Sequence, residues 1–164
     1  MADTVYINYS HDVNVATTTL ICTYIDALGS YLAGKDASAS HFQEFIKRYM
    51  NEFGHNAAGQ SATVRVPGQN VSKPYMEIFY EEFRNGFVHS YIGKVSVAII
   101  KNKPGTKYAP YFSEDREGYG LVVNLDWLVP DFLLGLEKYR RDVHTVEAVY
   151  RTFVNRFESI SDGA

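Results

Sequence analysis

The segment that most clearly indicates the fold runs from Ser72 to Gly93 and reads SKPYMEIFYEEFRNGFVHSYIG. At about 100° per residue, its apolar side chains gather on one broad face, made of Met76, Phe79, Tyr80, Phe83, Phe87 and Tyr91. Ser72 and Pro74 fit the start of a helix and Gly93 fits its end. We therefore predict an amphipathic helix over about residues 73–92, with this face packed against the core.

The same helical periodicity of apolar residues recurs elsewhere in the chain. It predicts further helices over about residues 13–33, 40–53 and 130–159, the last as one helix or as two. Gly34 is placed to end the first of these, Ser38 or Ser40 to cap the second and Gly54 to end it. Residues 55–72 read as a loop that contains a short extended piece from Ala62 to Val66.

After Gly93 the periodicity becomes that of a strand. Val95, Val97 and Ile99 alternate with other residues, and the tetrapeptide 103–106, Lys-Pro-Gly-Thr, suits a type II turn. We expect a β-hairpin here, within a region of about residues 94–124 whose last part, 120–124, adds a third strand. The fold class is therefore mainly α, an antiparallel helical bundle with an inserted β-hairpin or small antiparallel sheet, in a single domain over residues 1–164.

Composition narrows the class of protein. No run approaches the roughly 18 to 20 apolar residues of a membrane-spanning helix, so we expect no membrane partner. Cys22 is the only cysteine, which rules out an intrachain disulfide and favours a cytoplasmic location. We interpret it as an unreactive thiol. The net charge of −3 argues against a general nucleic-acid coat protein, so any RNA contact should be local.

The helix over residues 73–92 also carries polar residues away from its core face. Asn85 and His89 fall on the opposite arc one turn apart, and Arg84 lies at the flank. Ile78 and Val88 also project off the core face. Apolar residues mixed with Arg and His suggest that a second chain packs here, with Ile78 and Val88 at the interface.

The run from Glu81 to Tyr91, EEFRNGFVHSY, resembles the signature of HEPN domains. In that family an Arg is followed by a small polar residue and, after four to six residues in all, by a His. Here four residues separate Arg84 from His89, Asn85 is the polar residue, and Tyr91 completes the extended form found in HEPN toxins that are paired with nucleotidyltransferase antitoxins.

The resemblance implies a helical bundle that forms a homodimer with the two motifs facing each other, and metal-independent cleavage of RNA without a cofactor. His89 can exchange protons near neutral pH, Arg84 can grip a phosphate and Asn85 can orient the imidazole or the substrate. The family context implies a toxin or defence role with a cognate antitoxin or nucleotidyltransferase as partner. It also suggests a regulatory role for Tyr91, for which core packing is the alternative.

A basic stretch follows the motif. Between Phe83 and Ser113 there is no acidic residue, while Arg84 and four lysines give a local charge of +5. We predict that these lysines bind RNA: Lys94, Lys101, Lys103 and Lys107. The alternative is that lysines at strand edges prevent aggregation.

Other interpretations of the motif remain open. Arg84 can simply pair with Glu81 one turn earlier, and His89 can be an interface residue without a chemical role. A second class of function is then a non-catalytic HEPN-like module that binds a nucleotide, RNA or a protein partner. The scattered histidines lack ligand spacing, and no metal site is expected.

Overall fold

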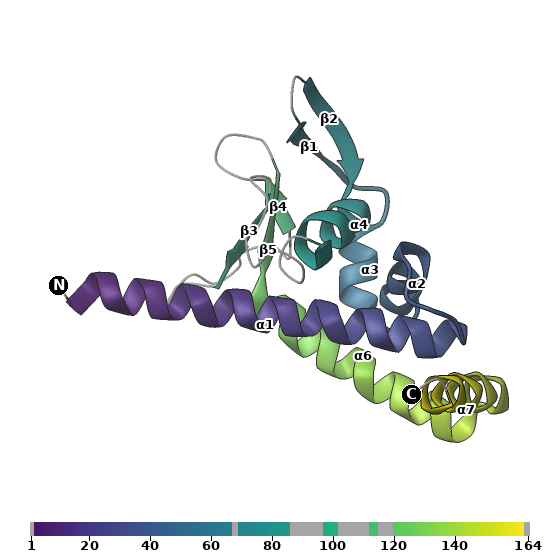
Figure 1. Cartoon of the computed structure of the whole chain (residues 1–164). Helices are drawn as coiled ribbons and strands as arrows, with labels where there is room; N and C mark the ends of the chain where they lie inside the picture. Colours follow the sequence, from purple (N-terminus) through teal and green to yellow (C-terminus); the bar gives the residue numbers. More distant parts are fainter. Residues whose placement is uncertain (1, 67–68, 86–96, 102–111, 115–119, 163–164) are drawn as a thin grey trace.

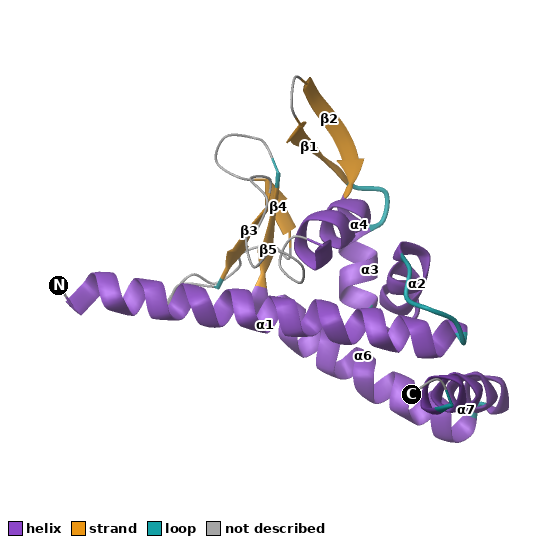
Figure 2. Cartoon of the chain, in the orientation of Figure 1, coloured by secondary structure: helices purple, strands orange, loops and turns teal. Residues whose placement is uncertain are grey.

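The computed structural model describes residues 2–66, 69–85, 97–101, 112–114 and 120–162. Within them the chain is mainly helical, as predicted, with two small sheets (Figure 2). The helices are α1 (Ala2–Ala33), α2 (Ala39–Tyr49), α3 (Asn51–Ala57), α4 (Tyr75–Ile78), the π-helical turn η1 (Phe79–Arg84), α6 (Leu125–Thr145) and α7 (Glu147–Ser161). Helix α1 runs the length of the molecule, with both sheets, α2, α3 and α4 above it and α6 and α7 below it in Figure 1.

The first sheet is an antiparallel hairpin of β1 (Ser61–Val66) and β2 (Gln69–Pro74). The extended piece expected at 62–66 is therefore confirmed as part of β1. Its partner strand was not expected, because Ser72 was assigned to a helix cap. The structure places Ser72 within β2 opposite Thr63, and α4 begins only at Tyr75.

The second sheet differs from the expected hairpin. It contains β3 (Val97–Ile100), β4 (Phe112–Glu114) and β5 (Leu121–Asn124) in the order β3-β5-β4. Strand β5 lies in the centre, parallel to β3 and antiparallel to β4. A hairpin with a second arm over residues 107–112 was expected, and 107–111 lie outside the described residues. Among the described residues β3 pairs with β5 and not with β4. All four residues of β5 are buried, so the most apolar strand takes the central position.

Helix boundaries agree with the sequence at some ends and differ at others. Gly34 has φ +65° directly after α1, and Ser38 caps α2 by accepting from the His41 amide. Helix α1, however, starts at Ala2 rather than near residue 13. Gly54 lies inside α3 and does not end a helix. The last helical region is two helices, since Val146 adopts an extended conformation between α6 and α7.

The break between α2 and α3 at Met50 is stabilised by α6. Asp131 is buried, and its carboxylate accepts from the backbone amides of Phe53 (2.7 Å) and Glu52 (3.4 Å) in the first turn of α3. The first amides of a helix generally lack an acceptor within the helix, so Asp131 acts as an N-cap supplied by another helix. One turn later Gly135 lets α6 approach, because a Cβ there would lie 3.2 Å from the Tyr49 carbonyl oxygen.

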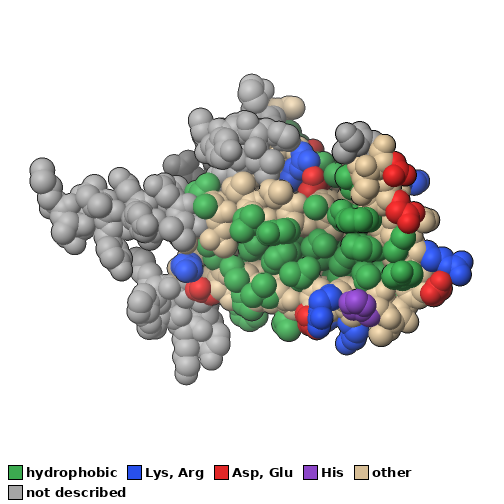
Figure 3. All heavy atoms as spheres, turned by 60° about the horizontal axis from the view of Figure 1, so that its bottom comes forward, with side chains coloured by type: hydrophobic (Ala, Val, Ile, Leu, Met, Phe, Trp, Pro, Cys, Tyr) green, Lys and Arg blue, Asp and Glu red, His purple; other side chains and the backbone are tan. Residues whose placement is uncertain are grey.

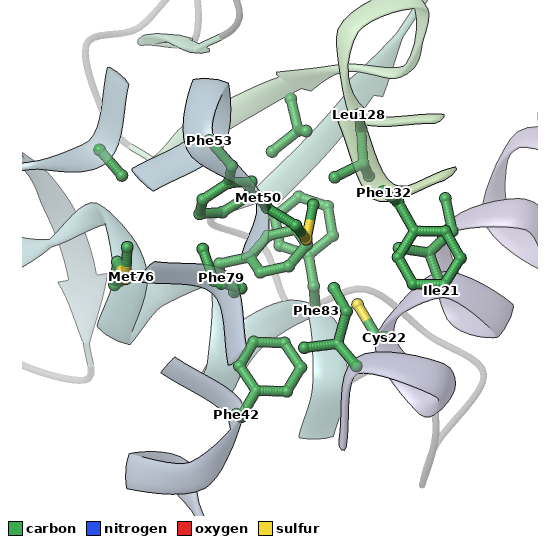
Figure 4. Close-up of a cluster of buried hydrophobic side chains, with 14 of the residues drawn as sticks. Ile21, Cys22, Phe42, Met50, Phe53, Met76, Phe79, Phe83, Leu128 and Phe132 are labelled. Atoms are coloured by element: carbon green, nitrogen blue, oxygen red, sulfur yellow. The ribbon is translucent and has the colours of Figure 1, made fainter. Parts of the chain in front are cut away.

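Aromatic rings form the centre of the core (Figure 4). The Phe79 ring lies 4.7 Å from that of Phe53 and 5.1 Å from that of Phe83, centroid to centroid, and 5.9 Å from that of Phe42. All four side chains are fully buried. Each contributes roughly 1.5 to 3 kcal/mol through burial, and together they hold η1 against α2 and α3. No helix among the described residues is long and apolar enough to cross a membrane.

Candidate functional site

The first two residues of the candidate motif lie where η1 ends. Arg84 is the last residue of the π-helical turn, and the Asn85 amide donates to the Tyr80 carbonyl oxygen five residues earlier. A π turn inserts extra backbone into the helix and changes the direction of the side chains that follow it, and such turns are frequent at functional sites. The wider turn therefore sets how Arg84 and Asn85 are presented.

Arg84 is held by a carboxylate from a distant part of the chain. Its Nη2 donates to Asp26 Oδ2 on α1 at 2.6 Å, and its Nη1 donates to Asn85 Oδ1 at 2.9 Å. The guanidinium also lies 5.6 Å from the centre of the Tyr80 ring. The Arg84 and Asp26 side chains are only 19% and 13% exposed. These four residues form one polar cluster, which we call the Arg84 cluster, between α1 and η1.

The alternative that Arg84 pairs with Glu81 is therefore wrong. Glu81, one turn before it, pairs with Lys73 of β2 instead. Asp26 was missed as a site residue, although the sequence holds a signal for it: Asp26 is the only charged residue between Val13 and Gly34. A lone carboxylate on a helix that packs against the core needs a cationic partner, because burying an unpaired charge is costly.

Asp26 has a second oxygen, which is also buried. Among the described residues, Oδ1 has no hydrogen-bond partner. A carboxylate oxygen without a partner costs free energy when it is buried, so the cluster retains an unused acceptor beside Arg84.

The predicted interface role of Ile78 is wrong. Ile78 is fully buried within the chain and belongs to the core. The helical projection allowed for one buried face, whereas the α4–η1 segment packs against β2, α1 and α2, which cover it on more than one side. Val88, its expected partner at the interface, lies outside the described residues.

The remaining predicted site residues fall mostly outside the described part of the chain. These are His89, Tyr91, Lys94, Lys103 and Lys107. Lys101 is described, and it is exposed directly after β3. The structure therefore brings Arg84 and Asn85 together and adds Asp26 and Tyr80 to them, while the relation of this cluster to His89 stays a prediction.

Cys22 lies one turn before Asp26 on α1 and is completely buried. Burial raises the pKa of its thiol, the neighbouring Asp26 carboxylate raises it further, and the Arg84 guanidinium opposes both effects. The thiol stays protonated at neutral pH, which agrees with its interpretation as unreactive. Within the described residues, no three His, Cys, Asp or Glu side chains gather as a metal site.

The Arg84 cluster has the chemistry to bind an anion. Asp26 already balances the Arg84 charge, so the cluster is a pre-oriented guanidinium rather than an isolated cation. About a fifth of the Arg84 side chain is exposed, and an anion can approach from that side.

Comparisons of the chain with protein-family models, with curated proteins and with solved structures found no significant match. The interpretation of the site therefore rests on its residues and their geometry.

Proposed function

We propose that this chain is a metal-independent endoribonuclease of the HEPN type. The observation that carries the proposal is the Arg84 cluster, in which the motif arginine is oriented by Asp26 and contacts the motif asparagine. A guanidinium held in one orientation binds a phosphate with less loss of side-chain freedom than a mobile one. The resemblance of residues 81–91 to the HEPN signature supplies the rest of the argument.

In the proposed reaction the 2′-hydroxyl of RNA attacks the adjacent phosphorus. The hydroxyl loses its proton to a base, the bond from phosphorus to the 5′-oxygen breaks, and that oxygen takes a proton from an acid. Arg84 would stabilise the charge on the phosphate, and His89 would serve as base or acid. One imidazole cannot hold both protonation states at once, so we propose that a second chain supplies the second His89.

RNA would reach the site along the basic stretch that follows the motif. Lys101 is exposed at the end of β3, and we propose that Lys94, Lys103 and Lys107 extend the same binding surface. In a cell such an activity fits a toxin or defence component held in check by an antitoxin or a nucleotidyltransferase.

A second candidate function is a non-catalytic HEPN-like module that binds a nucleotide, RNA or a protein partner. The observation that favours it is the charge balance of the Arg84 cluster. Because the Asp26 carboxylate is only 2.6 Å away, it competes with a substrate phosphate for the same guanidinium. A structural ion pair would have this geometry without any catalytic role.

The test compares four forms of the chain under a tightly controlled promoter. His89→Ala removes the proposed acid and base without touching the Arg84–Asp26 pair, and Arg84→Ala removes the phosphate contact. The matched control is Arg140→Ala/His55→Ala, which removes an exposed Arg from α6 and an exposed His from α3. Growth and the integrity of total RNA are scored in each case.

The nuclease proposal expects growth arrest and RNA cleavage with the wild type and the control, and neither with His89→Ala or Arg84→Ala. Purified protein with a defined single-stranded RNA should show the same pattern in the presence of a metal chelator. Cleavage that survives His89→Ala would overturn the proposal. A wild type that leaves RNA intact but binds it would favour the second candidate.

A further inference from the structure

A broad apolar surface covers the side of the molecule formed by α1, α6 and α7 (Figure 3). Its side chains are between 36% and 56% exposed, although all are large and apolar. We call this surface the α7 face, and we assign to it eight of the exposed large apolar residues of the three helices and the α6–α7 junction: Leu20, Tyr24, Leu133, Leu136, Val146, Tyr150, Phe157 and Ile160. Scattered apolar residues need no explanation on a protein surface, but a contiguous group usually marks a binding surface.

Helix α7 contributes an ordered stripe to this face. Val146, Tyr150, Phe153, Phe157 and Ile160 follow one another at intervals of four, three, four and three residues. This is the spacing of the apolar seam by which two helices pack side by side in a coiled coil. The chain itself covers only part of this stripe. The Phe153 ring stacks on that of Tyr31 at 5.0 Å between centroids, whereas the Phe157 side chain is 55% exposed.

The side of α7 next to the stripe is fixed to α1, which limits how far the stripe can turn. Val149 is buried, and Arg156 donates to Ser30 Oγ at 3.1 Å and to Asp36 Oδ1 at 2.7 Å. Helix α7 therefore cannot turn its apolar residues inward without breaking these contacts.

The size of the α7 face fits a protein partner. The three aromatic side chains have roughly 150 to 250 Å² each and the five aliphatic ones less, so the eight half-exposed residues present on the order of 500 to 800 Å². A stable interface buries about 800 Å² on each partner. The face lies at the upper end of what a monomer exposes, or above it, and matches what one half of a dimer needs.

The shape of the face favours a second copy of the same chain. A two-fold interface must be complementary to itself, so one chain has to offer both projections and hollows. Tyr150 and Phe157 project from α7. Next to Tyr150, at the elbow between α6 and α7, a hollow of about 340 Å³ is lined by Val143, His144, Thr145, Val146, Glu147 and Tyr150. An aromatic side chain of a second copy would fit there.

We propose that two copies of this chain pair through the α7 face, with the α7 stripe of one copy packed on that of the other. This interface is separate from the proposed RNA site. Tyr24 and Asp26 are two residues apart on α1, which places them about 200° apart around the helix. The pairing therefore leaves both Arg84 clusters uncovered. The contact that brings two His89 side chains together in the nuclease proposal is a different one, which we take to form on RNA, so measuring the mass without RNA tests the two proposals separately.

The test measures molar mass by light scattering and by sedimentation at micromolar concentrations. Without RNA, we expect the wild type to have twice the 18.6 kDa mass of one chain. Phe157→Arg should return the mass to that of one chain, because it places a charge in the centre of the apolar stripe. Ile160→Glu, a second variant at the exposed end of the stripe, should act in the same direction.

The matched control is Asn155→Arg, which adds the same charge to an exposed position on α7 about 200° away from Phe157. It should leave the mass doubled, and circular dichroism should show that all four proteins are equally helical. A wild type with the mass of one chain would overturn the proposal. A dimer that survives both Phe157→Arg and Ile160→Glu would place the pairing on another surface and would overturn it as well. So would capture of a different protein or of lipid vesicles by a monomeric wild type.

Discussion

Asp26 and Arg84 are separated by 58 positions in the chain and joined by an ion pair of 2.6 Å. The pair links α1 to the end of η1 at the edge of the aromatic core, and both side chains are more than four-fifths buried. A pair of this kind cannot be replaced on one side alone without leaving a charge in a poorly solvated place. Asp26 therefore sets the position of the motif arginine.

We predict that Asp26→Ala lowers the free energy of unfolding by about 1 to 3 kcal/mol, because it removes the carboxylate partner of Arg84. Urea denaturation of Asp26→Ala, Arg84→Met and the double variant would measure the coupling between the two residues. The free energy of unfolding should fall less in the double variant than the sum of its decreases in the two single variants. Strictly additive losses would show that the pair contributes nothing.

Asp131→Ala should destabilise the fold by about 1 to 3 kcal/mol, because it leaves the first amides of α3 without their acceptor. Asp131→Asn should lose less, since its amide oxygen can still accept a hydrogen bond. Hydrogen exchange at the Phe53 amide would report the change directly. Glu137→Ala on the same helix removes an exposed carboxylate and should cost less than about 0.5 kcal/mol.

Gly29→Ala and Gly54→Ala should have opposite effects on stability. A Cβ on Gly29 would lie 2.5 Å from the His41 carbonyl oxygen, so α1 and α2 must separate, at a cost of about 1 to 3 kcal/mol or more. A Cβ on Gly54 meets nothing closer than 3.6 Å, and alanine is the better helix former by up to about 1 kcal/mol. Thermal denaturation of the two variants tests the comparison. Equal effects would contradict the close approach of α1 and α2.

Cys22 should be inert toward thiol reagents in the folded protein at neutral pH. Its side chain is fully buried, and burial raises the pKa of the thiol. We expect no labelling of the native chain, complete labelling in denaturant, and a native labelling rate limited by opening of the fold. Rapid stoichiometric labelling of the native protein would show that the α1–η1 contact opens readily.

Stability should fall in alkaline solution because of Tyr49. Burial raises the pKa of its hydroxyl to about 12, opposed by Arg48 and reinforced by Asp142, which accepts its hydrogen bond at 3.2 Å. An unfolded tyrosine ionises near pH 10. Between about pH 10 and 12 the unfolded chain therefore loses a proton that the folded chain keeps, and stability declines as pH rises.

Melting temperatures of the wild type and Tyr49→Phe across this range would check the sign. Tyr49→Phe should show a shallower decline, although not a flat one, since burial also raises the pKa of Tyr139. Identical slopes in the two proteins would show that Tyr49 is not responsible.

Local patterns in the sequence were enough to identify much of the helical structure. The spacing of Phe42, Phe45, Ile46 and Tyr49 predicted a helix over about residues 40–53. All four side chains are buried in α2, which covers the first part of that range, but the chain breaks at Met50 before α3. Gly34 and Ser38 correctly marked helix ends, because a left-handed glycine and a serine cap depend only on residues within one turn of them. Arg84 and Asn85 were selected as site residues, and they do lie in contact.

Contacts between distant segments were decided only by the tertiary structure. The central place of β5, the capping of α3 by Asp131 and the pairing of Arg84 with Asp26 each join residues that no periodicity relates. Ile78 was assigned to the surface because a helical projection assumes one buried face, whereas β2, α1 and α2 together cover the α4–η1 segment on more than one side. The sequence by itself indicated most of the helical segments, because helix formation depends on neighbours within a turn, but it missed the early start of α1 and the break at Met50. The packing of the helices decides which charges meet, which strand is central and which apolar stripe stays exposed. That packing exists only once the chain has folded.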